Sequence, residues 1–358
     1  RYLADHSIVD IYHDCAAFDH IGDSLVRQVV PEEPFFNRFF AELGFRLAVP
    51  AEIDPRGMDR QGASFCHPVE LAHAYAASLV KLDPDFYFLP LLRSIPVADS
   101  SPEYSSTCVF VQGEPFYLRT AFPQLAGEKS LTPTLYLADG FRANLQALRE
   151  IAPKLNVNPA VIDPALAEAT AAQEEFFDDI RQMGREALDD LRRDPDAFGL
   201  VLFGRPYNSF AAIANKGIPA KFATRGHRII PVDMLPSACP SDVAVPNMYW
   251  AMGRVIMSGA HRIKDDPQLF GTYITNFSCG PDSFIISYFR DLMGRKPSLT
   301  LELDSHTADA GLETRIEAFL DIVRYYRQLG NNRKKVPPRK FTPARLEKQD
   351  NRPGIMTS

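Results

Sequence analysis

Three cysteines are the residues of this chain best placed to do chemistry, and Cys279 is the clearest of them. It ends the apolar run that begins at Tyr273, and it is followed by Gly280, which permits a sharp turn, and Pro281, which suits the first position of a helix. The exposed amides at a helix N-terminus favour negative charge, so a thiol there tends toward the thiolate that binds metal or attacks carbon. We therefore expect Cys279 to be a thiolate at a strand-to-helix turn.

Cys66 and Cys108 occupy similar positions. Cys66 lies two residues before Pro68, and Cys108 follows a turn-rich stretch and precedes a helix that we expect to open at Pro115. The 42 residues from position 66 to 108 and the 171 from 108 to 279 match no zinc-ribbon or ferredoxin spacing. A site built from these thiols is therefore assembled by the fold, and the alternative is that each is a small buried apolar residue.

Two further cysteines and one arginine are weaker candidates. Cys15 lies among His and Asp residues that suit a metal patch, although a solvated N-terminal arm is the simpler explanation. Cys239 lies in a loop, either as a fourth ligand or, more simply, as an inert thiol. Arg205 follows a buried strand in the turn 204–208, where it either faces an anionic substrate or phosphate or is an ordinary loop arginine.

Glu302, Asp304 and His306 alternate across the end of a predicted strand, and a period of two places all three on one face. They are candidates for supplying protons or binding a metal. The competing structural explanation is that Asp304 or Asp309 caps a helix beginning near Gly311, while His306 braces the turn. We leave both explanations open, with Glu302, His306 and Arg205 as candidate catalytic residues.

The elements that position these residues follow from length and patterning. A chain of 358 residues exceeds what one core usually organises, which favours two α/β lobes. Short apolar runs alternate with longer helical ones, a pattern typical of doubly wound, mainly parallel sheets. The expected organisation is an N-terminal arm, a first α/β lobe, a helical bridge, a second α/β lobe and a basic Pro-rich linker, at residues 1–33, 34–137, 138–195, 196–330 and 331–358.

The individual elements are expected as follows. Strands are predicted at Phe45–Val49, Phe86–Leu89, Phe198–Phe203, Arg228–Val232, Gly271–Phe277 and Ser298–Leu303, with a strand or turn at Cys108–Val111. Helices are predicted at Pro34–Leu43 and Pro68–Leu82 and near 215–225, 246–259, 282–293 and 312–327. Because open α/β sheets bind ligands at the carboxyl ends of their strands, we expect the cysteines to meet there.

Composition narrows the class of protein. No apolar stretch is long enough to span a bilayer, and five scattered cysteines are typical of reduced thiols, so we expect a cytoplasmic protein without a membrane segment. Residues 331–358 hold eight Lys or Arg against two acids, a charge of +6, so the remainder carries −12 of the total of −6. An acidic body makes nucleic acid an unexpected partner. The chain opens on Arg1, so we expect a piece of something longer.

Five motifs together resemble a known family, and the resemblance covers Pro34 to Arg327. They lie at residues 65–73, 204–208, 247–250, 275–284 and 301–311. They are similar to the cysteine-containing domain of large activase-related proteins in the 2-hydroxyacyl-CoA dehydratase and benzoyl-CoA reductase superfamily. The run from Thr275 to Phe284 is the most specific of the five.

The resemblance implies an iron–sulfur cluster in a cleft between two flavodoxin-like lobes, with Cys66, Cys108 and Cys279 as ligands. Three ligands leave one iron of a 4Fe-4S cubane open to substrate, water, a fourth residue or a sulfide that joins two cubanes. Val109 stands where the family usually has Pro after the cysteine, which makes Cys108 the least secure ligand. The chain has no Gly-rich phosphate loop, so ATP is expected only on a partner.

Three functions remain open at this stage. The first is an iron–sulfur component that receives a low-potential electron from an activase-type ATPase and passes it to an acyl-CoA or another hard-to-reduce acceptor. The second is a cluster-free scaffold that docks the ATPase and a dehydratase-like lobe. The third is a thiol or zinc enzyme that uses Cys279 with His73 or His306. Whether the domain is itself an enzyme is left undecided.

Overall fold

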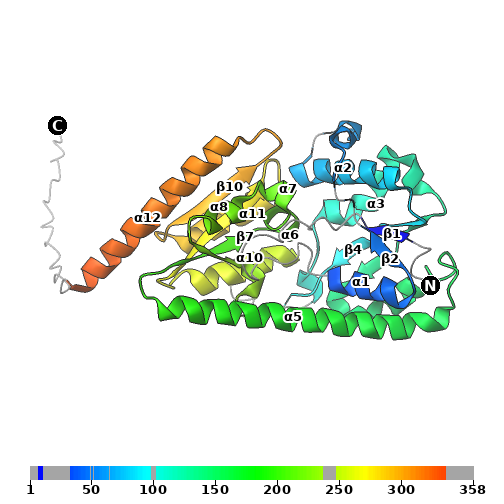
Figure 1. The fold of residues 1–358 in the computed structure, drawn as a ribbon, viewed down its shortest axis with the longest axis horizontal. Coiled ribbons are helices and arrows are strands. Elements are labelled where there is room, and N and C mark those ends of the chain that lie inside the picture. The colour runs from blue at the N-terminus through cyan, green and yellow to red at the C-terminus, as the bar shows by residue number, and fades with distance from the viewer. Residues whose placement is uncertain are drawn as a thin grey trace, which may run out of the picture.

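The protein is an α/β structure with parallel sheets. The computed structural model describes residues 7–10, 33–48, 50, 52–63, 65–97, 102–236 and 247–335. Cys15 and Cys239 lie outside these residues. Strands of the first half gather at one end of the molecule and strands of the second half at the other, with the long helix α5 along both (Figure 1).

The first sheet is built from short parallel strands. Its order is β2-β1-β3-β5, formed by β1 (Ser7–Asp10), β2 (Arg46–Ala48), β3 (Phe86–Phe88) and β5 (Ser130–Leu131). Two of these strands continue, past Pro90 and Pro133, as the parallel pair β4 (Leu91–Ser94) and β6 (Thr134–Tyr136). Proline has no N–H for the ladder, which explains why both strands are interrupted at the same level.

The second sheet has longer strands in the order β10-β9-β7-β8. These are β7 (Gly199–Phe203), β8 (Arg228–Pro231), β9 (Leu269–Asn276) and β10 (Ser298–Leu303), and all three pairings are parallel. Every residue of β7 and β9 is buried, as expected for strands covered by helices on both faces. In both sheets the first strand along the chain lies between the second and the third, so the two halves share one strand order.

Helices cover the sheets and connect them. In the first half they are α1 (Glu33–Glu42), α2 (His67–Leu82), α3 (Val109–Ala121) and α4 (Leu145–Arg149). The 32-residue α5 (Ile162–Arg193) packs against α1 and then reaches the second half. Short 3-10 turns lie at η2 (Pro55–Arg60), η3 (Pro102–Tyr104), η4 (Pro123–Ala126), η5 (Leu137–Asp139), η6 (Phe141–Asn144), η7 (Pro159–Val161) and η8 (Val232–Met234).

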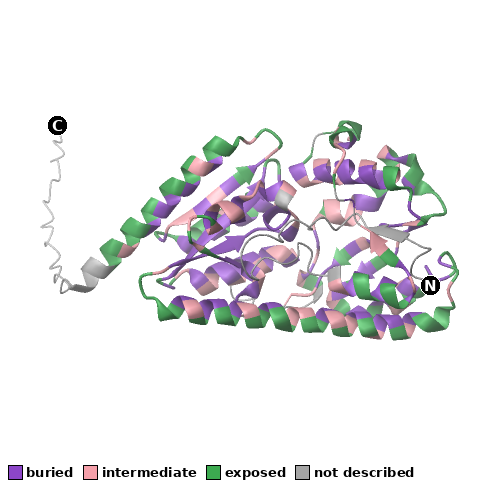
Figure 2. Ribbon diagram, in the orientation of Figure 1, coloured by how far each residue is buried: buried purple, intermediate pink, exposed green. Residues whose placement is uncertain are grey.

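The second half carries helices α6 (Pro206–Ser209), α7 (Ala212–Asn215), α8 (Ile218–Ala223), α10 (Ala251–Ile263), α11 (Gly280–Met293) and α12 (Asp309–Lys335). Helix α12 crosses one face of the second sheet with its apolar side inward and its outer side exposed (Figure 2). Its last residues extend beyond the body in Figure 1.

Most predicted elements are confirmed, and one is wrong. Each range predicted as a strand contains a strand, and each range predicted as a helix contains a helix. The exception is the one range for which a strand or a turn was predicted. The stretch Cys108–Val111, expected as a strand or turn, instead caps and begins α3, and Pro115 lies inside this helix rather than opening it. Val-Phe-Val favours a strand locally, but tertiary packing overrides such a short preference. Strand β1, within the range expected to be an arm, was not predicted, and neither were β4, β5 and β6.

Buried apolar residues form three clusters in the described part of the chain. One lies mainly in the first half and takes in Ala251 of α10, and another lies beneath α5 and α10 in the second half. The third joins the halves, because α2 and α3 pack through it against residues of the second sheet, α7 and α8. This shared cluster places the starts of α2 and α3 beside the carboxyl ends of the second sheet.

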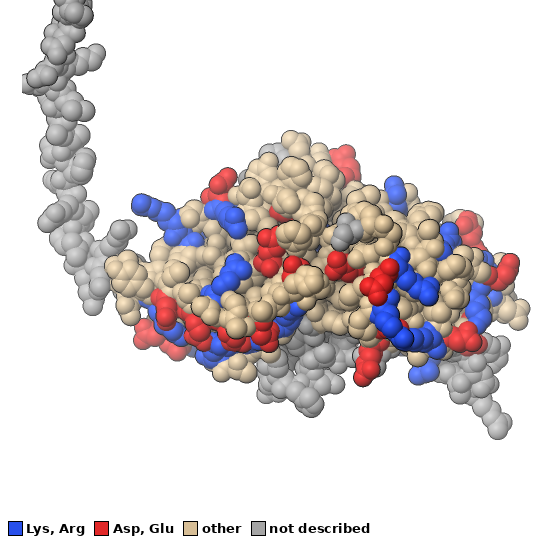
Figure 3. Space-filling view, turned by 90° about the horizontal axis from the view of Figure 1, so that it is seen from above, with Lys and Arg blue, Asp and Glu red and all other residues tan. Residues whose placement is uncertain are grey.

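The surface in Figure 3 intermixes Lys and Arg with Asp and Glu and shows no continuous basic area on that face. Within the described residues, no helix combines the length and apolar character that crossing a bilayer requires.

Candidate functional site

Each of the three central cysteines is the N-cap residue of a helix. Cys66 precedes α2, Cys108 precedes α3 and Cys279 precedes α11, all with extended backbone. Cys279 Sγ also accepts a hydrogen bond from the backbone N–H of Asp282 at 3.3 Å, as a capping side chain does. The expectation that a thiol directly precedes a helix is therefore confirmed for Cys66 and Cys279, whereas Cys108, expected in a strand or turn, also caps a helix.

Cys279 lies at the switch point of the second sheet. The chain leaves β7 toward β8 on one side and leaves β9 toward β10 on the other, so the carboxyl ends of β7 and β9 are the position at which open α/β sheets bind ligands. The turn after β9 depends on Ser278, whose φ of 61° is left-handed, and not on Gly280. Gly204, after β7, has φ 141°, and a Cβ there would lie 2.5 Å from the Ile274 carbonyl oxygen. Only glycine fits that turn.

Arg205 links the two turns through Cys279 and Asp282. Its Nη2 donates to Cys279 Sγ and, at 3.2 Å, to Asp282 Oδ2, and both the arginine and the aspartate are buried. Asp282 also accepts the hydroxyl groups of Tyr273 at 3.1 Å and Thr275 at 2.5 Å. A buried carboxylate with three donors holds the guanidinium in place beside the thiol.

Cys66 and Cys108 line one cavity with Arg205 and Tyr207. Its volume is about 100 Å³, and Tyr117 of α3 forms another part of the wall. A second, smaller hollow of about 70 Å³ also contains Cys108, Arg205 and Tyr207. The turn after β7 therefore separates Cys279 from the cavity of the other two thiols, with Arg205 touching both sides.

The segment before α3 is tied to both halves. Thr107 Oγ1 donates to the Leu92 carbonyl oxygen at 2.5 Å, and its N–H donates to Arg93 at 3.0 Å. Ser106 exchanges backbone hydrogen bonds with the second half, donating to Tyr249 at 3.0 Å and accepting from Ala251 at 2.9 Å. These contacts hold Cys108 at the junction of the halves.

Burial raises the pKa of two of the thiols, Cys279 and Cys66. It raises the pKa of Cys279 to about 12, with Arg205 acting in the opposite direction. It also raises the pKa of Cys66, and a charge on Cys66 would raise the pKa of Cys279 further, which shows that these groups are near one another. The prediction that Cys279 is a thiolate is wrong in this structure, because burial outweighs the helix N-terminus.

Several buried polar groups around Cys279 lack partners. These are Arg205 Nε and both amide atoms of Asn208 and Asn276, and neither asparagine is more than 1% exposed. Asn208 follows the turn after β7, and Asn276 ends β9, so both belong to the turns that flank the switch point. Sequence reasoning did not single them out, although both lie in motifs that it noted. Buried amides without partners are costly and indicate a missing ligand.

The other candidates lie elsewhere. His73 is buried in α2, where its Nδ1 bonds the Val69 carbonyl oxygen at 2.7 Å and its ring stacks on Tyr117. Glu302 is exposed on β10, and His306 is exposed in the following turn. Asp304 Oδ1 accepts the His306 N–H at 2.9 Å, which agrees with the structural explanation of that turn. None of these residues lines the cavity of Cys66 and Cys108.

The fit to a metal is partial. No three His, Cys, Asp or Glu side chains in the described ranges are placed to hold a single metal ion. A polynuclear cluster needs its thiolates farther apart than one ion does. Cys66 and Cys108 line one cavity, and Cys279 lies behind the turn after β7 with Arg205 between them, so the arrangement suits such a group better than a single ion. Cys66, Cys108 and Cys279 are the residues that would hold it.

A family model described as the CoA enzyme activase uncharacterised domain (DUF2229) matches residues 28–235, more than half of the chain. The matched part contains Cys66, Cys108 and Arg205 and ends before Cys279. No curated protein matches the chain. The expected association with activase proteins is confirmed at this level.

Proposed function

Because this chain belongs to the family of the CoA enzyme activase uncharacterised domain, we propose that it is the iron–sulfur component of an ATP-dependent, low-potential electron-transfer system. The acceptor is an acyl-CoA or another hard-to-reduce compound. The observation that carries the proposal is the grouping of three helix-capping cysteines from distant parts of the chain around one junction.

Cys66, Cys108 and Cys279 would hold a 4Fe-4S or double-cubane cluster, which supplies one-electron transfer at low potential. The protein contributes the surroundings of the sulfurs. The backbone amide of Asp282 already donates to Cys279 Sγ, and the amides of Asn208 and Asn276 are available as further donors. Hydrogen bonds to sulfur and exclusion of water are the means by which a protein tunes such a potential.

Arg205 has a positioning role in this proposal. Its guanidinium keeps a positive charge at the site, because burial alone would lower its pKa but Asp282, Tyr207 and Cys279 raise it well above the usual value. That charge favours the deprotonated form of the neighbouring thiols. If Cys279 held an iron, its sulfur would no longer accept the hydrogen bond from Arg205, and the ion pair with Asp282 would still hold the arginine in place.

The partners follow from the same proposal. The two sheet regions act as two flavodoxin-like lobes with the cluster between them. An activase-type ATPase supplies the electron, since the chain has no Gly-rich phosphate loop, and a dehydratase-like lobe receives it.

Anaerobic purification with full cluster-assembly capacity tests the proposal. We expect brown protein with absorbance near 400 nm, and with iron and acid-labile sulfide in equal amounts, all lost in Cys279→Ala. Asn158→Ala is the matched control, because it removes another helix-start side chain, one that bonds Ala160 N–H at 3.0 Å away from the thiols. Colourless, iron-free wild-type protein would overturn the proposal.

One observation favours a second function, a cluster-free scaffold that docks the ATPase and the dehydratase-like lobe. Within the described residues, no three side chains are placed to bind one metal ion, and Cys279 Sγ already accepts a hydrogen bond from Arg205. Pull-down of an activase-type ATPase by both wild type and the triple variant Cys66→Ala/Cys108→Ala/Cys279→Ala would support the scaffold. Loss of that binding in the triple variant, with its fold intact, would exclude it.

A further inference from the structure

The largest described cavity lies on the other side of the turn after β7. It measures about 320 Å³ and is bounded by α5, η8 and α10. Gly204 and Pro206 line it, whereas the alternate residues Arg205 and Tyr207 line the cavity of Cys66 and Cys108. The two cavities are therefore separate, and the thiol chemistry does not account for the larger one.

Asp233 is a polar residue of this cavity, and its backbone is held in place by close packing. It belongs to η8, which two helices approach closely at glycines. A Cβ on Gly184 of α5 would lie 1.9 Å from the Met234 carbonyl oxygen, and one on Gly259 of α10 would lie 2.2 Å from Val232 Cγ2. Since larger residues cannot occupy these positions without movement, the helices fix the η8 turn and the site is preformed.

One oxygen of the Asp233 carboxylate lacks a partner, although the backbone amides of Asp233 and Met234 stabilise the group. Its Oδ1 is shielded from solvent and accepts no hydrogen bond, although Arg262 lines the same cavity. Burial raises the pKa of Asp233 to about 6, in keeping with a carboxyl group that no cation neutralises. No group in the described residues donates to this oxygen, so it is available to a ligand that carries a donor.

The remaining wall is mainly apolar. Phe177 and Ile180 of α5, Phe210 after α6 and Met252 and Val255 of α10 contribute to it. A cavity of about 150 Å³ is enough to hold benzene, so this one accommodates roughly a dozen non-hydrogen atoms. A ligand that satisfies all parts of the wall has an apolar body, a donor for Asp233 and an anionic group for Arg262.

We propose that this cavity binds an apolar α-amino acid, with its ammonium group on Asp233, its carboxylate toward Arg262 and its side chain among Phe177, Phe210 and Val255. Such a ligand offers an ammonium group to Asp233 and a carboxylate to Arg262, two groups of the cavity wall that form no ion pair with each other. It would also touch the backbone of the turn that positions Arg205.

Isothermal titration of the 358-residue chain with three probes tests this site. L-phenylalanine carries all three features, 2-phenylethylamine lacks the carboxylate, and 3-phenylpropanoate lacks the amine. We expect L-phenylalanine to bind most tightly. Asp233→Asn should weaken the two amines by about tenfold or more and leave 3-phenylpropanoate unaffected, because a charged hydrogen bond is lost only with the amines.

Arg262→Gln provides the complementary result and keeps the test independent of how Asp233→Asn folds. It should weaken the binding of L-phenylalanine and of 3-phenylpropanoate, the two probes with a carboxylate, by about tenfold and leave the binding of 2-phenylethylamine unchanged. Asp291→Asn, which changes an exposed carboxylate of α11 outside the cavity, should alter none of the three affinities. The absence of binding by L-phenylalanine at millimolar concentration, or equal effects of both cavity variants on all three probes, would overturn the proposal.

Discussion

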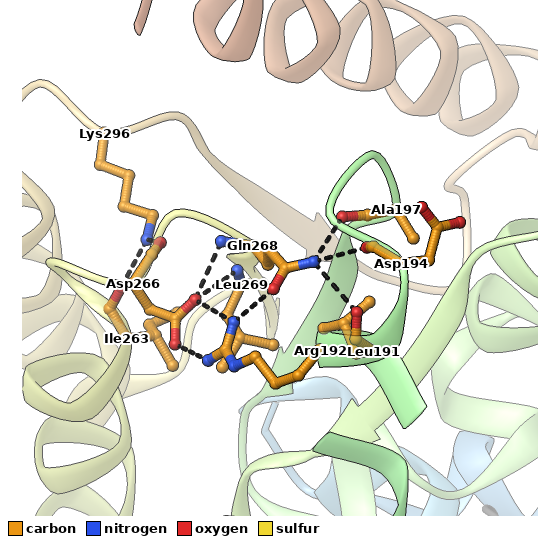
Figure 4. Close-up of polar contacts among 9 residues, drawn as sticks. All are labelled: Leu191, Arg192, Asp194, Ala197, Ile263, Asp266, Gln268, Leu269 and Lys296. Atoms are coloured by element: carbon orange, nitrogen blue, oxygen red, sulfur yellow. Dashed lines mark hydrogen bonds and ion pairs between the residues drawn. The ribbon is translucent and has the colours of Figure 1, made fainter. Parts of the chain in front are cut away.

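The two ends of the second sheet differ in whether their buried polar groups form hydrogen bonds. At the amino end, just before β9, a polar cluster bonds only to itself and to nearby carbonyls (Figure 4). Arg192 pairs with Asp266 and donates to Gln268 Oε1 at 2.7 Å. Lys296 Nζ donates to the carbonyl oxygens of Ile263, at 2.5 Å, and Asp266. The side chains of Arg192, Asp266, Gln268 and Lys296 therefore all have structural partners there.

At the carboxyl end, the opposite holds. Asn276, the last residue of β9, and Asn208 are buried with neither amide atom bonded, and Arg205 Nε is also without a partner. The same strand therefore begins in a saturated network and ends in an unsaturated one. This difference teaches that burial of polar groups marks a ligand site only where their hydrogen bonds are unmade.

The largest expected effect comes from breaking the one complete network at the carboxyl end. Asp282→Asn should lower the free energy of unfolding by about 3 to 5 kcal/mol, because it leaves the buried Arg205 charge without its partner. Urea denaturation of the cluster-free protein measures this. The exposed Asp291→Asn in the same helix should stay within about 0.5 kcal/mol. A loss below about 1 kcal/mol for Asp282→Asn would contradict the geometry.

The polar cluster at the amino end should make the free energy of unfolding depend on pH. Burial lowers the pKa of Lys296 to about 8, while the unfolded chain keeps the usual value of 10.5. Between these values the unfolded state binds more protons, so stability rises with pH by about 3 kcal/mol from this group. The measured quantity is the difference in unfolding free energy between wild type and Lys296→Met from pH 8 to 10.5. A difference that is flat across this range would show that Lys296 is not desolvated.

The alkylation rate of Cys279 tests whether the carboxyl end is closed to solvent. Cys279 is buried, bonded to Arg205 and protonated at neutral pH, so iodoacetamide should modify it about a hundredfold or more slowly than a free thiol. Pulsed alkylation of cluster-free protein with mass spectrometry measures the rate. The rate is compared between wild type and Arg205→Gln, which removes the hydrogen bond to Cys279. Arg149→Gln, at the exposed end of α4, is the control. Rapid labelling of Cys279 in wild type would mean that this end is open.

The most direct comparison uses the two flanks of β9. Gln268 Nε2 donates to the carbonyl oxygens of Leu191, Asp194 and Ala197 at 2.8 to 3.1 Å, so Gln268→Leu should cost about 1 to 3 kcal/mol. Asn276→Leu removes a buried amide that bonds nothing, so it should leave the stability of the cluster-free protein unchanged or raise it by up to about 1 to 3 kcal/mol. Equal losses in the two variants would erase the distinction between the ends.

Much of the fold could be predicted because its signals are local. The runs at Phe198–Phe203 and Gly271–Phe277 are continuously apolar, as buried parallel strands must be, and both proved to be strands. Strand β1 could not be predicted in this way. It has four residues, and it is a strand because β2 and β3 pair with it from both sides. Pairing between distant segments leaves little trace in so short a stretch.

The candidate site was predicted in its members but not in its chemistry. Cys66, Cys108 and Cys279 each cap a helix, as the residues around them suggested for two of the three. The thiolate character of Cys279 was predicted wrongly, because the helix N-terminus is a local feature whereas burial depends on the whole fold. Asn208 and Asn276 escaped notice for the same reason, since an amide without a partner is recognisable only when its neighbours are known.

By itself, the sequence determined the longer strands and helices and the helix-start positions of Cys66 and Cys279, because apolar periodicity and proline placement act over a few residues. The tertiary structure alone decided that Arg205 lies against Cys279, that Cys66 and Cys108 share a cavity, and that the polar groups at one end of β9 are bonded while those at the other are not. Those outcomes depend on contacts between residues far apart in the chain, and desolvation and hydrogen bonding are set only when these contacts form.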